Sequence, residues 1–283
     1  MRTLSQAEKS SHIPKVVAVM TARNEENHIK QTLTCLKKQT LPLSKIIVVN
    51  DGSTDKTGEI ARNLGCLVVD LPFHSESYVG RPELAERLNI GLKLAREENP
   101  DYVLIVGADH PLPSDYVEQL VKRMELNQKL VVASGYIEGE PYVETHPRGS
   151  GRLVKACFWK QISNMQYPVC WGWESWLCFK AMQLGFQTKC FKELKTKVER
   201  VTGLGKAGYL GKAMYALGYN WKYALGRCIL TFLKSPKAGL SMFWGWFKHE
   251  NVERLDIADW VNNMQKKRFW SRVWRIIKHG GRK

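Results

Sequence analysis

The chain has 283 residues, of which 44% are hydrophobic and 25% are charged, which excludes an intrinsically disordered protein. The formal net charge is +16, and most of it lies near the C-terminus. Residues 1–194 contain 24 Lys and Arg against 22 Asp and Glu, a net +2, whereas residues 195–283 contain 19 against 5, a net +14. This asymmetry indicates an anionic partner for the C-terminal third: a membrane surface, a phosphorylated ligand or a nucleic acid.

The seven cysteines are scattered, and none forms a C-x-x-C pair. This pattern excludes a zinc ribbon and a disulfide framework, and it indicates a reducing compartment. No apolar stretch reaches the length of a membrane span, and the polar first dozen residues lack the apolar core of a signal peptide. We therefore expect a cytoplasmic protein that touches the inner face of the cell membrane without crossing it.

Alternating apolar runs and helical patterns predict an α/β fold. Strands are predicted over residues 15–20, 45–49, 67–69, 102–106 and 130–134. Helices are predicted over 24–38, 55–64 with Asp55 as its cap, most of 80–100, 115–126, 153–164 and 174–184, and again beyond residue 203. Strands and helices in this alternation predict right-handed crossovers on a mostly parallel sheet.

Polar segments directly follow three of the predicted strands. They are TARNEE over 21–26, NDGSTDKT over 50–57 and GADH over 107–110. In an open α/β sheet, ligands bind at the carboxyl ends of the strands, so these segments are expected to share one edge. Asp109 beside His110 is a candidate site for a divalent metal ion, and a loop Asp satisfied by backbone amides is the commoner alternative.

In this order the three segments resemble those of the inverting family 2 glycosyltransferases, which have a GT-A-type fold. The resemblance covers about residues 16–190, and VVNDGSTDKT is its most specific part. It implies a Rossmann-like, mostly parallel sheet flanked by helices. We accordingly expect a flexible leader over 1–14, a GT-A-type catalytic domain over 15–200 and a basic helical subdomain over 201–283.

The resemblance implies a donor in which a sugar is joined to a nucleoside diphosphate, UDP or GDP. Thr21, Arg23, Glu25, Asp51 and Asp109 are the residues that would then line the nucleotide pocket. Asp51 can accept hydrogen bonds from a base N–H or a ribose hydroxyl. It can also shape its own loop as an Asx-turn residue, and the two roles are compatible.

Asp109 corresponds to the second Asp of the family's DxD motif, which binds Mn²⁺ or Mg²⁺ bridging the diphosphate. The sequence differs from the family's motif at two positions next to Asp109: Gly107 replaces the first Asp, and His110 replaces a common third acid. His110 is either a second metal ligand, which would suit Mn²⁺ better than Mg²⁺, or a bystander. Both interpretations stay open.

Glu174, in GWESW, lies where the family has its Glu-Asp motif, and it is the candidate general base that takes a proton from an acceptor hydroxyl. Ser175 stands where the Asp is usual. Trp173 and Trp176 either offer stacking faces to a sugar ring or fill a core while Glu174 only stabilises a helix start. Further candidate contacts to the acceptor or pyrophosphate, with solvated basic residues as the alternative, are Arg87, His146, Arg148 and Arg152.

If Glu174 acts as a base, the acceptor is expected to be a hydroxyl on a glycan or a lipid-linked glycan, because a lipid phosphate is already ionised and needs no base. The alternative is a polyprenyl- or dolichyl-phosphate sugar synthase. The segment KKRFWSRVWRIIK over 266–278 predicts a basic amphipathic helix, which lies on an anionic membrane or packs on protein. A third interpretation is a basic nucleic-acid- or membrane-binding protein whose catalytic domain is inactive, although the sequence contains no recognised nucleic-acid-binding motif.

Overall fold

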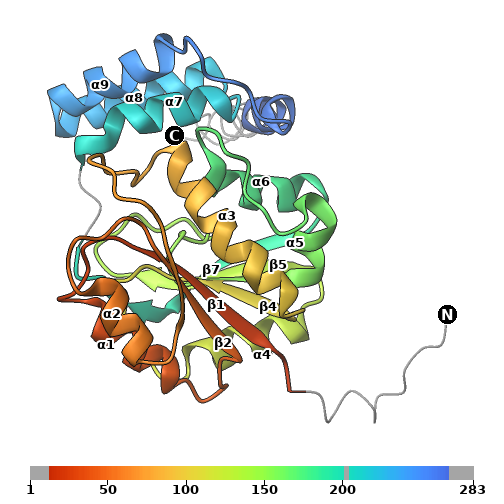
Figure 1. Ribbon diagram of the computed structural model, residues 1–283. Coiled ribbons are helices and arrows are strands. Elements are labelled where there is room, and N and C mark those ends of the chain that lie inside the picture. The colour runs from red at the N-terminus through yellow and green to blue at the C-terminus, as the bar shows by residue number, and fades with distance from the viewer. Residues whose placement is uncertain (1–12, 201–203, 268–283) are drawn as a thin grey trace. The chain divides into compact units, whose positions relative to one another are not determined.

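A computed structural model describes residues 13–200 and 204–267 (Figure 1). The strands are β1 (Val16–Ala22), β2 (Lys45–Asn50), β3 (Leu67–Asp70), β4 (Tyr102–Ile105), β5 (Leu130–Ile137), β6 (Arg152–Lys155) and β7 (Gln187–Thr196). The helices are α1 (Ile29–Lys37), α2 (Thr57–Asn63), α3 (Pro82–Glu97), α4 (Tyr116–Leu126), α5 (Ala156–Ser163), α6 (Trp173–Gln183), α7 (Ala207–Ala216), α8 (Trp221–Lys234) and α9 (Pro236–Phe247).

The chain forms two compact units. Among the described residues, the first unit contains those up to His74, Leu88–Gln166 and Lys189–Arg200, and the second contains Ser75–Arg87, Tyr167–Thr188 and those after Arg200. The segments 75–87 and 167–188, which the sequence places within 15–200, therefore cluster with the C-terminal helices. Trp171, for example, lies against Tyr209 of α7, with the ring centroids 5.2 Å apart.

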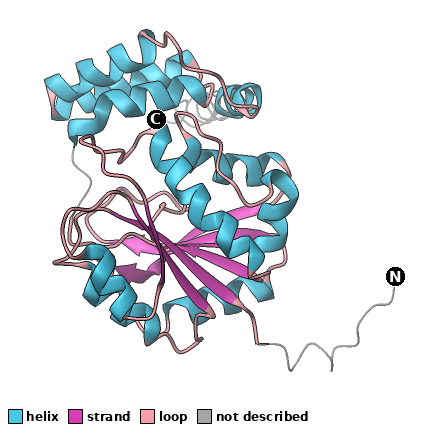
Figure 2. Ribbon diagram, in the orientation of Figure 1, coloured by secondary structure: helices cyan, strands magenta, loops and turns pink. Residues whose placement is uncertain are grey.

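The first unit is built on one seven-stranded sheet in the order β3-β2-β1-β4-β6-β5-β7, with helices on both faces (Figure 2). β3, β2, β1 and β4 are parallel neighbours, and β6 runs antiparallel between β4 and β5. This is the mostly parallel, helix-flanked sheet that the sequence predicts. Because β1 lies between β2 and β4, the carboxyl ends of these three strands are adjacent.

Alternate side chains of β1 pack on opposite faces of the sheet. Val16, Ala18 and Met20 belong to one hydrophobic cluster with apolar residues of α1 and α4. On the other face, Gly91 of α3 lies so close that a Cβ there would be 2.7 Å from Cγ1 of Val19. All of these β1 residues are fully buried, as expected for a strand covered on both sides.

Two predicted helices differ from the structure at their starts. Residues Arg152–Lys155 form strand β6, so the helix predicted over 153–164 is wrong at its beginning. Leu153 and Val154 are both completely buried between β4 and β5, and burial on both faces outweighs the local helical pattern. The first helix begins at Ile29 and not near Asn24, because Asn24 has a left-handed backbone with φ of 53°.

The second unit contains α6 to α9, and of these α7, α8 and α9 lie in the helical region that the sequence predicts beyond residue 203. The backbones of α7 and α9 are in direct contact, since a Cβ at Gly211 or Gly245 would lie 2.1 Å from a main-chain oxygen of the other helix. α8 and α9 are similarly close, because a Cβ at Gly239 would lie 2.4 Å from Cα of Phe232. In the part of the chain that the structure describes, none of the helices is both long and apolar enough to cross a membrane.

Gly52, beside Asp51, lies where the loop after β2 packs closely against the loop after β3. Its φ is +66°, and a Cβ there would lie 2.7 Å from the carbonyl oxygen of Pro72. We expect Gly52→Ala to lower the free energy of unfolding by about 2–4 kcal/mol, from backbone strain and overpacking together, measured by denaturant unfolding. Gly185→Ala is the matched control, because Gly185 has a φ of +80° but no atom within 4 Å of its Cβ position. Only the strain of about 1–2 kcal/mol applies there, so equal losses would contradict the close approach.

Candidate functional site

The predicted polar residues come together at the carboxyl edge of the sheet in the first unit. Asp51 directly follows β2, Arg23 and Glu25 follow β1, and Asp109 follows β4. Thr21 lies within β1, paired with Val49 of β2. The side chains that the sequence assigns to nucleotide binding are therefore placed on three neighbouring strand ends.

The loops after β1 and β2 are bound to each other through Asn24. Its Oδ1 accepts a hydrogen bond from the backbone N–H of Thr54 (2.9 Å), and its own N–H donates to Oγ of Ser53 (3.0 Å). The left-handed backbone of Asn24 turns the chain so that both bonds form at once. Asn24 is thus a structural residue of the first motif.

A second pair of contacts joins the same two loops. The N–H of Glu25 donates to Oγ1 of Thr57 (2.7 Å), and the N–H of Glu26 donates to Oδ2 of Asp55 (3.1 Å). Oδ1 of Asp55 accepts from the N–H of Thr57 (2.9 Å), the first residue of α2, so Asp55 binds the start of this helix, although the N-cap position itself is Lys56 and not Asp55 as predicted. These bonds hold the backbone and leave the side chain of Glu25 available for other contacts.

Asp51 and Arg23 both contact His74, in the loop after β3, a residue that the sequence analysis did not single out. Asp51 is 4% exposed, and its Oδ1 lies 3.1 Å from Nε2 of His74. The guanidinium of Arg23 donates to the carbonyl oxygen of the same histidine. His74 therefore joins the loops after β1, β2 and β3 at the place where the sequence predicts the nucleotide.

Glu25 and Asp109 share a second unpredicted partner, Arg200. Nε of Arg200 lies 3.2 Å from Oδ2 of Asp109, and its Nη2 pairs with Oε1 of Glu25. Burial raises the pKa of the Glu25 carboxyl, and the hydrogen bond and charge of Arg200 offset only part of that shift. No motif marks Arg200. The only available signal was the need for a positive charge between two carboxylates, which does not identify one arginine among many.

His110 is turned away from solvent and is completely buried. Its Nδ1 lies 2.6 Å from Oγ of Ser150, which also accepts a hydrogen bond from the N–H of Gly107 (2.8 Å). A Cβ at Gly107 would lie only 3.3 Å from the same Oγ, so Ser150 crowds the place where the family has its first Asp. Burial lowers the pKa of His110 to about 4, and the ring is therefore neutral near neutral pH.

The carboxylates at this edge suit a divalent cation whose remaining ligands are phosphate oxygens of a diphosphate. Within residues 13–200 and 204–267, no three His, Cys, Asp or Glu side chains gather as a metal site. Asp109 and Glu25 do hold a cationic group between them, and Oε2 of Glu25 is buried without a hydrogen-bond partner among the described residues. One or two carboxylates together with substrate phosphates are the usual ligands of Mg²⁺. The residues present therefore fit Mg²⁺ or Mn²⁺.

The basic loop before β6 is largely structural. Arg152 is completely buried, and its guanidinium donates to the carbonyl oxygens of Pro147 (2.7 Å) and Arg148 (3.1 Å). It has no surface to offer a ligand, which corrects the expectation of a contact to acceptor or pyrophosphate. Arg148 pairs with the buried carboxylate of Glu140, and its side chain stays 34% exposed, while His146 is half-buried.

Glu174 lies in the first turn of α6, in the second unit, and is half-buried. The tryptophans beside it belong to the core of that unit, with Trp173 7% and Trp176 5% exposed. Nε1 of Trp173 donates to the carbonyl oxygen of Arg81 (3.1 Å), and Nε1 of Trp176 donates to Oδ1 of Asp256 (2.7 Å). Their rings fill space within the unit, as in the core-filling alternative, and stacking on a sugar stays a prediction.

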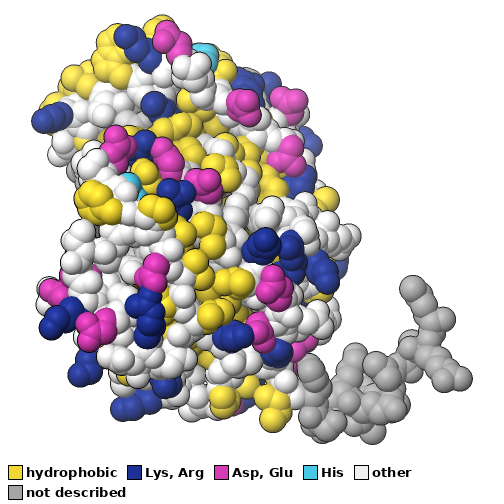
Figure 3. Space-filling view, in the orientation of Figure 1, with side chains coloured by type: hydrophobic (Ala, Val, Ile, Leu, Met, Phe, Trp, Pro, Cys, Tyr) yellow, Lys and Arg dark blue, Asp and Glu magenta, His cyan; other side chains and the backbone are white. Residues whose placement is uncertain are grey.

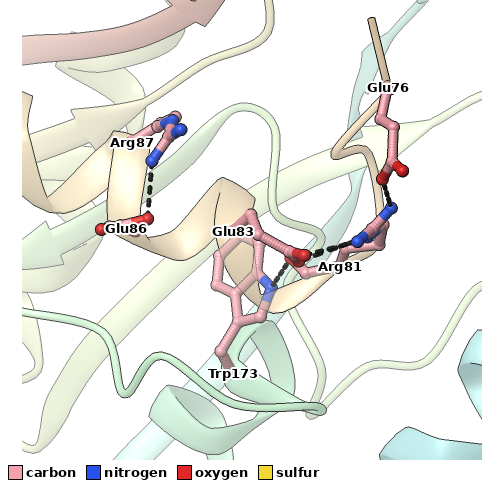
Figure 4. Close-up of polar contacts among 6 residues, drawn as sticks. All are labelled: Glu76, Arg81, Glu83, Glu86, Arg87 and Trp173. Carbon is pink, nitrogen blue, oxygen red and sulfur yellow. Dashed lines mark hydrogen bonds and ion pairs between the residues drawn. The ribbon is translucent and has the colours of Figure 1, made fainter. Parts of the chain in front are cut away.

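Arg87 is part of an ion-paired segment at the start of α3 (Figure 4). It pairs with Glu86 at 2.6 Å, and Arg81 pairs with both Glu76 and Glu83. All of these residues belong to the second unit. Arg87 is therefore already engaged with a carboxylate in this structure, and a contact between it and a ligand remains a prediction.

His110 gives the fold a specific dependence on pH. Its pKa is about 4 in the folded state against an ordinary value of 6.5, so the unfolded chain binds the proton more readily. Stability from this residue is present above pH 6.5 and is lost as the pH falls toward 4, by on the order of 3 kcal/mol. Denaturant unfolding in EDTA between these pH values should show a smaller loss for His110→Gln than for the parent.

His249→Gln is the control for that measurement, since His249 is exposed. It should keep the parent's pH dependence. An NMR titration of the His110 ring with an ordinary midpoint would contradict the burial that the structure shows.

Relatives of this chain include glycosyltransferases of bacteria. Glycosyltransferase GlyA of Streptococcus pneumoniae serotype 4 is 26% identical over 238 residues, which are 81% of this chain and 32% of that protein. The uncharacterized glycosyltransferase EpsJ of Bacillus subtilis is 31% identical over 124 residues, which are 44% of this chain and 34% of that protein. The chain thus matches about a third of the length of each of these relatives.

Solved structures share the fold. The mannosyltransferase PcManGT of Pyrobaculum calidifontis, in complex with GDP-Man and Mn²⁺, has a TM-score of 0.58 at 14% identity, covering 89% of this chain and 79% of that one. TarS of S. aureus in complex with UDP-GlcNAc has a TM-score of 0.55 at 15% identity, covering 88% and 84%. Residues 17–190, more than half of the sequence, match the family described as glycosyl transferase family 2. The chain therefore belongs to glycosyltransferase family 2, and its sheet is that of the GT-A fold.

Proposed function

We propose that the chain is an inverting glycosyltransferase that moves a sugar from a UDP- or GDP-linked donor to an acceptor hydroxyl, carried on a glycan or a lipid-linked glycan. The observation that carries this proposal is the edge of the first unit, where Asp51, Glu25 and Asp109 lie on three adjacent strand ends. Their pairing with His74 and Arg200 supports it, because carboxylates and cationic groups placed together suit a nucleotide with a charged diphosphate.

For the nucleotide, we assign base and ribose recognition to the Asp51 end of this edge. Asp51 accepts hydrogen bonds from a base N–H or a ribose hydroxyl, and Thr21 and Arg23 line the same place. A guanidinium is planar and stacks well on a base, so Arg23 suits a position where the family often has an aromatic ring. When the nucleotide binds, Asp51 either contacts both His74 and the ligand or gives up its contact with His74.

For the diphosphate, we assign Asp109 and Glu25 as the residues that hold a divalent ion, Mn²⁺ or Mg²⁺. When bound, such an ion supplies positive charge that stabilises the departing nucleotide. His110 is either a further ligand through Nε2, which is buried without a partner among the described residues, or a bystander. Arg200 adds a positive charge of the chain's own at the same carboxylates, and it can donate to phosphate oxygens.

For the chemistry, we assign Glu174 as general base. The acceptor oxygen attacks the anomeric carbon as the bond to the diphosphate breaks, and the acceptor proton passes to the Glu174 carboxylate. The assignment rests on the position of Glu174 in GWESW and on its location at the start of α6. Ser175 cannot take a proton in this way, so the chain has one candidate at this motif where the family has two.

We further propose that the enzyme works at an anionic membrane surface on the cytoplasmic side. The support is the net +14 of residues 195–283, since anionic lipids attract Lys and Arg near the surface. The segment 266–278, predicted as a membrane-binding helix, lies almost wholly outside the described residues. The membrane proposal therefore needs support from elsewhere in the chain.

Donor binding tests the site at the sheet edge. Calorimetry with UDP and GDP should show binding that Mn²⁺ strengthens, and Asp109→Asn should weaken the binding in Mn²⁺ by about 10–100-fold. Asp259→Asn, a change of an exposed residue in the second unit, is the control and should bind as the parent does. Failure of both nucleotides to bind would instead favour a basic binding protein with an inactive catalytic domain.

Glu174→Gln tests the acceptor class. The variant should bind donor normally but transfer sugar to a hydroxyl acceptor about 10²–10⁴-fold more slowly, because the amide cannot accept the proton. Glu97→Gln, an exposed position in α3, should keep full activity. If Glu174→Gln stays fully active toward a polyprenyl phosphate, the chain is a lipid-phosphate sugar synthase, because that acceptor is already ionised.

A further inference from the structure

The outer face of α8 is apolar and exposed. Ala224 and Cys228 are buried against the neighbouring helices, with 0% and 4% of their surface exposed. On the opposite side of the helix lie Ile229, Leu230 and Leu233, which are 52%, 65% and 75% exposed. A helix of a water-soluble domain normally places polar residues on that side, so this arrangement needs a partner to cover it.

α9 repeats the arrangement. Its inner side carries Ala238 and Met242, which are 6% and 2% exposed. Its outer side carries Leu240, Trp244 and Phe247, each at least 51% exposed. We call these three residues, together with Ile229, Leu230 and Leu233, the apolar face of α8 and α9.

The charged residues of α7, α8, α9 and the turns between them all have one sign. From Leu204 to His249 the chain contains no Asp or Glu. Its charged residues there are Lys206, Lys212, Lys222, Arg227, Lys234, Lys237 and Lys248. In Figure 3, hydrophobic and Lys or Arg side chains lie together at the upper left, where Figure 1 labels α8 and α9. Apolar side chains bordered by lysines, with a tryptophan among them, are typical of a helix that lies in a bilayer interface.

Charge argues against two other ways of covering this face. The segment 268–283, outside the described residues, contains six Lys and Arg and no Asp or Glu, so it would bring positive charge to a positive surface. A second copy of the chain would do the same by pairing this face with itself. An anionic lipid bilayer offers both an apolar interior for the side chains and negative headgroups for the lysines.

We infer that α8 and α9 dock flat on an anionic lipid bilayer through the apolar face, with the flanking lysines at the headgroups. The helices lie in the interface and do not cross the bilayer. This inference deepens the membrane part of the proposed function by naming the surface that binds. It does not depend on the donor, because the residues concerned are separate from those at the sheet edge.

Vesicle co-sedimentation of the full chain, without donor, tests the inference. The chain should bind vesicles of phosphatidylcholine mixed with phosphatidylglycerol, should bind phosphatidylcholine alone at least about tenfold more weakly, and should lose binding as salt is raised. The triple variant Leu230→Ser, Leu233→Ser and Trp244→Ser should reduce binding to the anionic vesicles by at least about tenfold. Leu126→Ser is the matched control, because Leu126 of α4 is 89% exposed and lies in the first unit.

Four results would overturn the inference. They are equal binding to both kinds of vesicle, unchanged binding by the triple variant, loss of binding when only residues 268–283 are removed, and a dimer in solution that the triple variant dissociates. Nucleotide calorimetry on the same samples distinguishes a failure of the membrane-docking inference from a failure of the proposed glycosyltransferase function. A chain that binds nucleotide but no vesicles would leave the donor site intact, and the reverse would leave the docking face intact.

Discussion

The site depends on the hydrogen bonds that join the loops after β1 and β2. Asn24, Asp55 and Thr57 accept backbone N–H groups of the opposite loop or of their own, and the two loops thereby hold one conformation. Loop backbone away from secondary structure needs such partners, because an unpaired polar group at a buried edge is costly. The backbone of Glu25 is held in this way without use of its carboxylate, which pairs instead with Arg200.

The carboxylates of Glu25, Asp51 and Asp109 each lie beside an arginine or a histidine. Arg200 bridges Glu25 and Asp109, and His74 lies against Asp51. Uncompensated carboxylates at a half-buried edge would repel one another, and the raised pKa of Glu25 shows that burial already disfavours its charged form. In the function proposed above, the phosphates of the nucleotide would replace the carboxylates as partners of Arg200.

The parallel sheet and most residues at its carboxyl edge could be predicted from the sequence, because buried parallel strands appear there as short apolar runs. Buried strands that end in polar residues have to bring those residues to one edge, and Asp51 and Asp109 follow that rule. Arg200 could not be found in this way, since it reaches the edge through the return of a distant segment. The burial of Arg152 and the start of β6 were missed for the same reason, because tertiary packing overrides local pattern there.

The position of β6 also bears on how the protein is made. β6 lies between β4 and β5 in the sheet, but it follows both of them in the chain. While a nascent chain ends before Arg152, β4 has an open edge and β5 has no neighbour on that side. Such edges invite pairing with other chains, and the contacts that close them span large sequence separations. We therefore expect the sheet to form late in synthesis and its folding to be slow, so that chaperones which shield strand edges would matter most at that stage.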